Sequence, residues 1–189
     1  MASDQKKTRR LDAYLAFVDE SGFLLIPTVR RTWAPRGKTP LLYHSYRRDR
    51  ISTIAALTVS PRRGRLGVYV QFHPKNITGV EVVVFLRGLL RHLPGPLVLI
   101  WDGGSIHYRR LVQDYVRSRR ARLHVYRFPA YAPEVNPAEH VWTNGKRYMS
   151  NGTPQDIDEL GGRVRLAIRR VARSQRLLRA CLRKSDLSF

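Results

Sequence analysis

The fold is decided by the stretch LVLIWD at residues 97–102, in which five apolar residues lead to a single acid. A continuous apolar run of this length predicts a strand that is buried on both faces. Pro94, Gly95 and Pro96 stand directly before it and end an apolar segment of helical spacing that follows Thr78, a residue suited to an N-cap. We therefore expect this strand to lie inside a sheet that helices cover.

The segments before this strand predict further strands that run antiparallel to one another. Short apolar or β-branched runs alternate there with polar clusters that contain glycine or proline. We expect strands at residues 13–18, 23–29, 51–59 and 66–72, with turns at residues 19–22 and 60–64. The first two would form a hairpin, so that this half of the sheet is an antiparallel meander.

The segments after the strand predict helices and one more strand. We expect a basic helix over residues 105–119, a strand over 123–128, a short helix over 137–149 and a longer helix over 153–184 that the pair Gly161-Gly162 could interrupt. The order describes an α/β fold, a mixed sheet with an antiparallel three-strand hairpin unit and flanking helices. It fits a ribonuclease H-like fold. It disfavours a doubly wound Rossmann fold, because the first strands lack crossover helices and a glycine-rich phosphate loop.

The charge of the chain indicates a nucleic-acid partner. Its 189 residues include 35 lysines and arginines against 14 acids, which gives a net charge of +21. Such an imbalance suits a polyanion with one phosphate per nucleotide. The single cysteine, Cys181, excludes a disulfide framework and a cysteine-based zinc site.

The chain shows no signal for a membrane or for export. No apolar run reaches the roughly 18 to 20 residues of a membrane span. Residues 1–10 are polar and basic and no apolar segment follows them, which is unlike a signal peptide. We therefore expect a soluble, intracellular protein with no membrane partner.

Three acids stand where strands and helices are expected to end or begin. Asp19 ends the first expected strand, Asp102 ends the buried strand, and Glu139 lies in the first turn of the helix that Asn136 and Pro137 open. If the two strands are neighbours, both aspartates emerge at one end of the sheet, and the helix could bring Glu139 beside them. Convergent carboxylates favour Mg²⁺, which prefers oxygen ligands, and two such ions support phosphodiester chemistry.

Each acid also has an interpretation without a metal. Asp19 could organise a turn, and Asp102 could serve as a turn residue or helix cap before Gly103. Glu139 could complete a capping box with Asn136 as the N-cap. The three acids together, on so basic a chain, favour the metal site.

Four segments carry recognisable motifs: FVDESGF at residues 17–23, RTWAPRG at 31–37, LIWD at 99–102 with His107 beyond it, and YAPEVNPAE at 131–139 with Trp142. They resemble the catalytic domain of DDE transposases, in the bacterial insertion-sequence branch of the mariner-like superfamily. The resemblance covers residues 11–149, and its first and last motifs are the most specific.

The resemblance implies that Asp19, Asp102 and Glu139 are the catalytic, metal-binding triad. The family pattern places the third ligand after Asn-Pro, which selects Glu139 over the nearby Glu134. The family often has asparagine after the second aspartate, where Gly103 stands here.

The resemblance further implies a metal-dependent endonuclease that hydrolyses a phosphodiester at the end of an insertion sequence. The released 3′-hydroxyl would then attack target DNA, in the family at a TA dinucleotide. The implied cofactors are two Mg²⁺ ions, with Mn²⁺ as an alternative. The implied partners are transposon ends and target DNA, a second copy of the chain in a homodimer on DNA, and a separate helix-turn-helix chain, because relatives carry such modules before the catalytic domain. The expected location is the bacterial cytoplasm, at the nucleoid.

Other residues are candidates for support. His107 could touch the scissile phosphate or orient a metal-bound group, although a surface or capping role is equally open. Asn136 could steady Glu139 or only cap its helix. Trp33 could stack on a flipped base, but an aromatic that packs in the core is favoured.

Basic residues are expected to hold the DNA backbone without reading its sequence. Residues 161–185 contain many arginines and no acid, and an apolar stripe runs along the same segment. The DNA-binding candidates are Arg36, Arg109, Arg110, Lys146, Arg163, Arg169, Arg170, Arg173 and Arg176.

The chain thus divides into a basic tail at residues 1–10, a catalytic domain at 11–150 and a basic helical segment at 151–189. A truncated or domesticated copy that binds DNA without cutting it is the alternative function, and its signature would be a lost carboxylate. A ribonuclease H or junction resolvase would explain the metal site but not the first and last motifs together.

Overall fold

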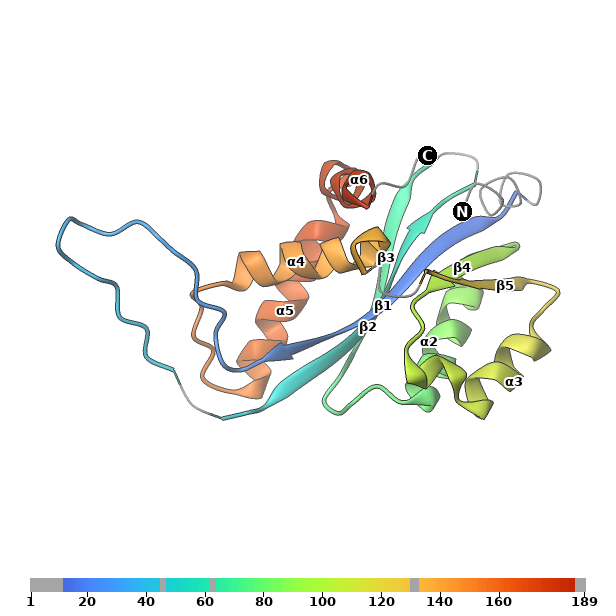
Figure 1. Cartoon of the computed structure of the whole chain (residues 1–189), viewed down its shortest axis with the longest axis horizontal. Coiled ribbons are helices and arrows are strands. Elements are labelled where there is room, and N and C mark those ends of the chain that lie inside the picture. Colours follow the sequence, from blue (N-terminus) through green and yellow to red (C-terminus); the bar gives the residue numbers. More distant parts are fainter. Residues whose placement is uncertain (1–11, 45–46, 62–63, 130–132, 186–189) are drawn as a thin grey trace.

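A computed structural model describes residues 12–44, 47–61, 64–129 and 133–185 of the chain. The strands are β1 Tyr14–Leu24, β2 Arg50–Val59, β3 Leu66–His73, β4 Leu97–Trp101 and β5 Leu123–Arg127. They form one five-stranded sheet in the order β3-β2-β1-β4-β5 (Figure 1). Strands β1, β2 and β3 pair antiparallel with one another, whereas β4 pairs in parallel with both β1 and β5. The predicted mixed sheet with an antiparallel three-strand unit is therefore confirmed.

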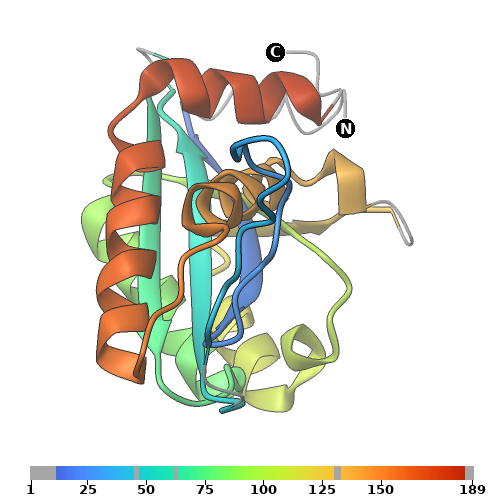
Figure 2. The ribbon, with the colours of Figure 1, turned by 90° about the vertical axis from the view of Figure 1, so that its left-hand side faces the viewer.

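Helices cover both faces of this sheet. They are α2 Gly79–His92, α3 Arg110–Ser118, α4 Pro137–Met149, α5 Ile157–Ala172 and α6 Gln175–Lys184, with the short 3-10 helices η1 Ser105–Tyr108 and η2 Pro133–Val135. Helices α2 and α3 lie on one side, and α4, α5 and α6 lie on the other (Figures 1 and 2). Among the described residues, no helix is both long enough and apolar enough to cross a membrane.

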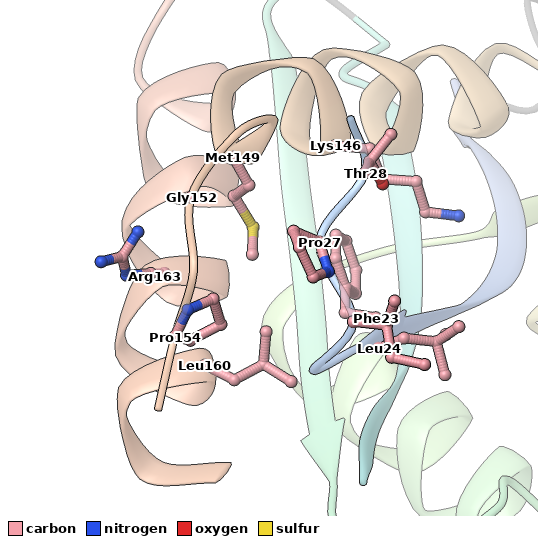
Figure 3. Close-up of a pocket in the computed structure, with 12 residues that line it drawn as sticks. Phe23, Leu24, Pro27, Thr28, Lys146, Met149, Gly152, Pro154, Leu160 and Arg163 are labelled. Carbon is pink, nitrogen blue, oxygen red and sulfur yellow. The ribbon is translucent and has the colours of Figure 1, made fainter. Parts of the chain in front are cut away.

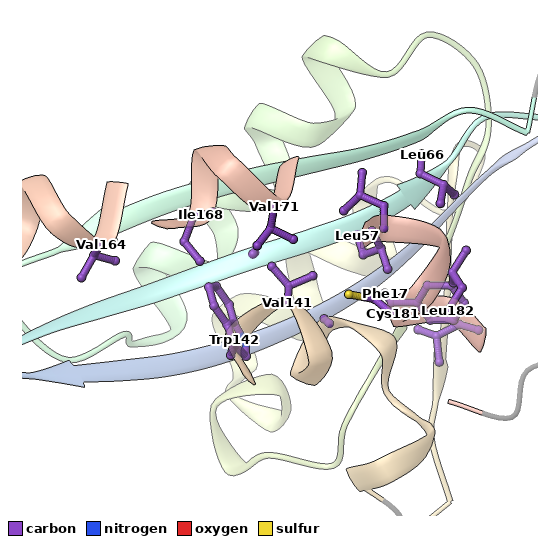
Figure 4. Close-up of a cluster of buried hydrophobic side chains, with 14 of the residues drawn as sticks. Phe17, Leu57, Leu66, Val141, Trp142, Val164, Ile168, Val171, Cys181 and Leu182 are labelled. Carbon is purple, nitrogen blue, oxygen red and sulfur yellow. The ribbon is translucent and has the colours of Figure 1, made fainter. Parts of the chain in front are cut away.

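Strand β4 is buried on both faces, as its apolar run predicted. All five of its residues are buried. Val98 and Ile100 contribute to the core under α4, α5 and α6, which also contains Phe17 and Trp142 (Figure 4). Trp101 and the other alternate residues of β4 contribute to the second core, under α2 and α3. The two cores fix the strand between them, and so fix the place where Asp102 leaves the sheet.

The predicted turn at residues 19–22 is wrong, and so is the hairpin built on it. Strand β1 continues through these residues and pairs with β2 as far as Leu24 opposite Arg50. The reason is burial with a period of two: Phe23 is buried in the α4 side core, while Gly22 and Leu24 are exposed. This packing outweighs the turn tendency of Ser-Gly. Asp19 consequently lies inside β1 rather than at its end.

The C-terminal helical segment is also divided differently from the prediction. The break falls between α5 and α6, where the Ser174 side chain accepts a hydrogen bond from the Leu177 N–H and caps α6. Gly161 and Gly162 lie within α5 instead. A Cβ on Gly161 would come within 3.2 Å of Ile51 Cδ1, so glycine there lets the helix approach the sheet closely. The predicted basic helix at 105–119 is split into η1 and α3 at Arg109.

Between β1 and β2 the chain runs as a long extended segment that projects from the body (Figure 1). Trp33 in this segment is fully exposed, so the prediction of a packed aromatic is wrong. Asn151 fastens the base of the segment: its side chain accepts from the Arg30 N–H (2.8 Å) and donates to the Arg30 carbonyl (3.0 Å), and its own N–H donates to the Thr28 carbonyl (3.0 Å). A hollow of about 170 Å³ lies beside this anchor, with Phe23 in its lining (Figure 3).

Four predictions lie wholly or partly outside the described residues. They are the basic tail at residues 1–10, the middle of the turn at 62–63, the first two residues of the motif at 131–139, and the end of the basic helical segment at 186–189.

Candidate active site

The parallel pairing of β1 and β4 sets Asp19 beside Asp102. The register of this pair runs from Tyr14 opposite Leu97 to Phe17 opposite Ile100. Asp19 stands two residues after Phe17, and Asp102 stands two residues after Ile100. The prediction that the two strands are neighbours is therefore confirmed. The register of the two strands, rather than a common end, sets the two aspartates side by side.

Asp19 lies in a buried, acidic environment. Its side chain is 6% exposed, and Trp142 Nε1 donates a hydrogen bond of 2.8 Å to its Oδ2 atom. Burial, followed by the charges of Glu139 and Glu20, raises the pKa of Asp19 to about 8. The hydrogen bond from Trp142 opposes this rise, and Asp102 adds a smaller contribution to it. Glu139, Glu20 and Asp102 are thus each close enough to Asp19 to act on its charge.

Asn136 positions Glu139 relative to β1. Its side-chain oxygen accepts from the Ala138 N–H (3.1 Å), and its side-chain nitrogen donates to the Val18 carbonyl (3.2 Å). The residue is 3% exposed. One amide therefore caps α4 and ties the first turn of that helix to the residue before Asp19.

The alternative reading of Glu139 as half of a capping box is not supported. Thr78 and Glu81 form both halves of such a box at α2. At α4, among the described residues, no hydrogen bond joins the Glu139 carboxylate to the Asn136 N–H, and only the Asn136 side chain caps the helix. The Glu139 carboxylate therefore does not cap α4.

His107 lies on the other side of the same strands, between two acids. Its Nε2 atom is 3.1 Å from Asp102 Oδ1 and 3.5 Å from Glu20 Oε2, and its ring stacks on Trp101 with centroids 4.1 Å apart. The residue has no exposed surface, so the predicted alternative of a surface histidine is wrong. Burial lowers the pKa of His107, but the hydrogen bonds to Asp102 and Glu20 outweigh it and raise the pKa to about 9.

His107 and the two acids beside it form a compact cluster, and the raised pKa of His107 favours its protonated form. Glu20, Asp102 and His107 offer ligand atoms within 4.8 Å of one another, a spacing that would suit a metal ion. An imidazolium has no lone pair for a metal, however, so His107 in this state holds the two carboxylates instead. Sequence reasoning missed Glu20. The predicted turn at residues 19–22 hid it, because only in a continuous strand does the residue after Asp19 face the opposite side.

Asp102 is held on one oxygen and ionised. Its Oδ1 atom accepts from the Gly104 N–H (2.9 Å) as well as lying against His107. The hydrogen bond from His107 lowers the pKa of Asp102. A Cβ on Gly104 would stand 3.0 Å from this oxygen, so glycine leaves room for the turn. The predicted turn role of Asp102 is therefore correct, and it does not exclude a second role for the other oxygen.

The donor set fits a hard divalent cation. Asp19, Asp102 and Glu139 supply carboxylate oxygens, which Mg²⁺ and Mn²⁺ prefer. Among the described residues, no lysine or arginine forms an ion pair with Asp19 or Glu139. Burial and, after it, the charges of the neighbouring acids raise the pKa of Asp19.

The basic residues predicted to bind DNA are distributed over several elements. Arg109 and Arg110 adjoin η1 on the α3 side, and Arg36 stands in the extended segment. Lys146 lies over the Phe23 ring at 5.6 Å, and Arg163 pairs with Glu159 at 2.8 Å. The remaining four, Arg169, Arg170, Arg173 and Arg176, are exposed on α5, on α6 and between them. The structure thus brings the acids together but not these cations.

Comparison with known families identifies the chain. Residues 14–161 match the family of DDE superfamily endonucleases. The match covers most of the chain, which therefore belongs to the DDE superfamily of endonucleases. Comparison with curated protein sequences found no match.

Solved structures of two kinds resemble the chain. A Mos1 transposase paired-end complex with the left transposon end has 16% identity and a TM-score of 0.66, over 97% of this chain and 55% of that chain. A mariner Mos1 paired-end complex with Mg has 14% identity and a TM-score of 0.67, over 97% and 56%. An intasome of simian T-cell lymphotropic virus has 13% identity and a TM-score of 0.52, over 84% and 48%.

These likenesses concern the fold. They confirm the predicted ribonuclease H-like architecture, with its mixed sheet and flanking helices. The chain spans a little more than half of the length of the Mos1 transposase chains that it matches.

Proposed function

We propose that the chain is the catalytic domain of a transposase from the bacterial insertion-sequence branch of the mariner-like group. It would hydrolyse a DNA phosphodiester at the end of the element and then join the freed 3′-hydroxyl to target DNA. One observation carries this proposal: Asp19 is buried close to Glu139, Glu20 and Asp102, so that burial and then the charges of these acids raise its pKa to about 8. Membership of an endonuclease superfamily supports the same reaction class.

Asp19, Asp102 and Glu139 would hold the metal, and the surrounding residues would fix their orientation. Trp142 holds one oxygen of Asp19, and His107 with the Gly104 N–H holds one oxygen of Asp102. In each aspartate the second oxygen is then the one left for a cation. Two divalent ions, when bound, would supply activation of the attacking oxygen and stabilisation of the leaving oxygen.

The basic side chains would bind the DNA backbone and steer it to this end of the sheet. The nine cations named above are the candidates, and the exposed arginines of α5 and α6 lie in residues 161–185, which contain no acid. Recognition of the element ends would come from a separate helix-turn-helix chain, and a homodimer on DNA would pair the two ends. The Mos1 structures, which hold transposon ends, support a DNA substrate for this fold.

The test is cleavage of pre-nicked or branched DNA in Mg²⁺ or Mn²⁺, because such DNA lessens the need for end recognition. Asp19→Asn, Asp102→Asn and Glu139→Gln should each reduce cleavage about 10³-fold or more, since each removes a charged metal ligand. Joining of a 3′-hydroxyl oligonucleotide to a plasmid, measured with the same variants, tests strand transfer.

Glu134→Gln is the matched control, because Glu134 is a neighbouring acid that is exposed in η2. It should retain the cleavage rate of the unaltered chain. Full cleavage by Asp102→Asn would overturn the proposal. Tight DNA binding without cleavage in either metal would favour the non-catalytic alternative.

A further inference from the structure

Arg127, on the strand next to the one that leads to Asp102, forms a pair with Tyr108. Arg127 is the last residue of β5 and stands opposite Trp101, the residue before Asp102. Its guanidinium lies 4.0 Å from the centroid of the Tyr108 ring, and its Nη1 atom donates to the Tyr108 hydroxyl at 2.9 Å. A Cβ on Gly103 would lie 3.8 Å from the same hydroxyl. The pair is therefore one strand away from Asp102 and touches the turn that follows it.

The packing of the fold does not account for this arrangement. Both side chains are exposed, Tyr108 by 52%. Among the described residues, Arg127 forms no ion pair with an acid, whereas Arg117 and Arg163 each pair with one from their own helix. Tyr108 thus holds a guanidinium close to a cluster of carboxylates without letting it pair with them.

A guanidinium held in this way suits a phosphate. It has five N–H donors in a planar fork, and the bond to Tyr108 uses one of them. The remaining donors match the two free oxygens of a backbone phosphodiester. Because the ring and the hydroxyl already restrain the side chain, binding would cost less conformational entropy than binding by a free arginine.

We propose that Arg127, restrained by Tyr108, binds a DNA backbone phosphate next to the phosphodiester that is cut. The inference rests on the proposed function, and it adds a substrate contact on the β5 side of the carboxylates. Neighbouring strands lie about 4.8 Å apart, so a backbone that presents one phosphate at Asp102 has an adjacent phosphate within reach of β5.

The test is the salt dependence of binding to a nicked duplex in EDTA, where no cleavage occurs. Arg127→Ala should weaken binding about 3- to 10-fold and lower the slope of log K against log salt by about one, the loss of one phosphate contact. Tyr108→Phe keeps the ring but not the hydroxyl, and it should cause a smaller loss. Thermal unfolding of each variant checks that the fold is intact.

Arg119→Ala is the matched control, because Arg119 also lies over a tyrosine, Tyr115, with 5.7 Å to the ring centroid. It should leave the salt slope unchanged. An unchanged slope in Arg127→Ala, or an equal change in both variants, would overturn the proposal.

A second measurement locates the phosphate. Single methylphosphonate linkages, which are uncharged, are placed in turn along the strand that is cut. At one position beside the cut, the linkage should weaken binding of the unaltered chain but not of Arg127→Ala. No such position would overturn the proposal, even if the chain cuts DNA normally. If such a position exists but the chain never cuts DNA, the phosphate site is supported and the proposed function is rejected.

Discussion

Asp19 and Glu20 are adjacent in β1, yet they lie in opposite electrostatic settings. Asp19 faces α4, where Trp142 is its hydrogen-bond donor and neighbouring acids help to raise its pKa to about 8. Glu20 faces η1, where His107 lies against it and against Asp102. On the η1 side His107 supplies a cation when it is protonated, and on the α4 side no lysine or arginine among the described residues pairs with Asp19. The contrast indicates which side is built to receive a cation from solution.

The largest expected effect comes from removing one charge on each side. Asp19→Asn should lower metal-dependent cleavage about 10³-fold or more, because it removes a metal ligand. Glu20→Gln should lower it only about 10- to 100-fold, as expected for a residue that acts through another. Single-turnover cleavage of nicked DNA in Mg²⁺ measures both. Equal losses in the two variants would show that both sides ligate the metal.

A smaller effect is expected from the cation of the η1 side. His107→Asn removes the positive charge between Glu20 and Asp102, so it should lower cleavage about 10- to 100-fold and weaken metal affinity by a similar factor. His107→Lys restores a charge and should recover part of the loss. The concentration of Mg²⁺ that gives half-maximal cleavage reports the change. If this concentration does not move while cleavage is lost, His107 acts on the DNA rather than on Asp102.

The third effect is the dependence of stability on pH in metal-free protein. The pKa of Asp19 rises from 3.8 to about 8 on folding, so the folded state binds this proton more tightly than the unfolded state. Stability should therefore fall as the pH rises from about 4 toward 8. His107, raised from 6.5 to about 9, acts in the same direction but only above about pH 6.5.

The window from pH 4.5 to 6.5 therefore isolates Asp19. As the pH rises across it, the free energy of unfolding of Asp19→Asn should increase by up to about 2 kcal/mol relative to that of the unaltered chain. Each kcal/mol corresponds to about 2–4 °C in Tm. Thermal unfolding in EDTA measures the difference. A constant difference between the two proteins across this window would mean that Asp19 is already ionised in the folded, metal-free state.

The smallest effect compares the two buried tryptophans. Trp142 Nε1 donates to Asp19, whereas the buried Nε1 of Trp101 has no hydrogen-bond partner among the described residues. Trp142→Phe should cost about 1 kcal/mol beyond the loss of volume that both variants share, because a hydrogen bond is broken only there. Urea unfolding of both variants gives the difference. A larger loss in Trp101→Phe would show that its N–H has a partner in solution.

The sequence was sufficient for the elements whose signals are local and strong. The apolar run of β4, the Thr78 cap of α2 and the Asn-Pro start of α4 each predicted an element that the structure contains. The sequence did not predict the elements whose bounds depend on packing between distant residues. Burial of Phe23 carries β1 through a sequence with turn tendency, and the close approach of Gly161 to Ile51 keeps α5 continuous.

The candidate site shows the same division. The acids Asp19, Asp102 and Glu139 could be selected from spacing and resemblance, because they stand at or near expected element ends. Glu20 could not, since its role depends on β1 being continuous and on His107 arriving from η1. The pair of Arg127 and Tyr108 depends on the register of two parallel strands, which the sequence does not state.

The double hydrogen bonding of Asn136 restricts which residues can stand at this position. Helix N-caps are ordinarily interchangeable among serine, threonine, aspartate and asparagine. At Asn136 the side chain must accept from Ala138 and donate to Val18 at the same time. Aspartate has no donor and would set a carboxylate against a carbonyl oxygen, and the hydroxyls of serine and threonine are one bond shorter and cannot reach both partners. Three of the four usual capping residues are thus ruled out by the docking of a helix on a strand, before any metal or DNA is bound.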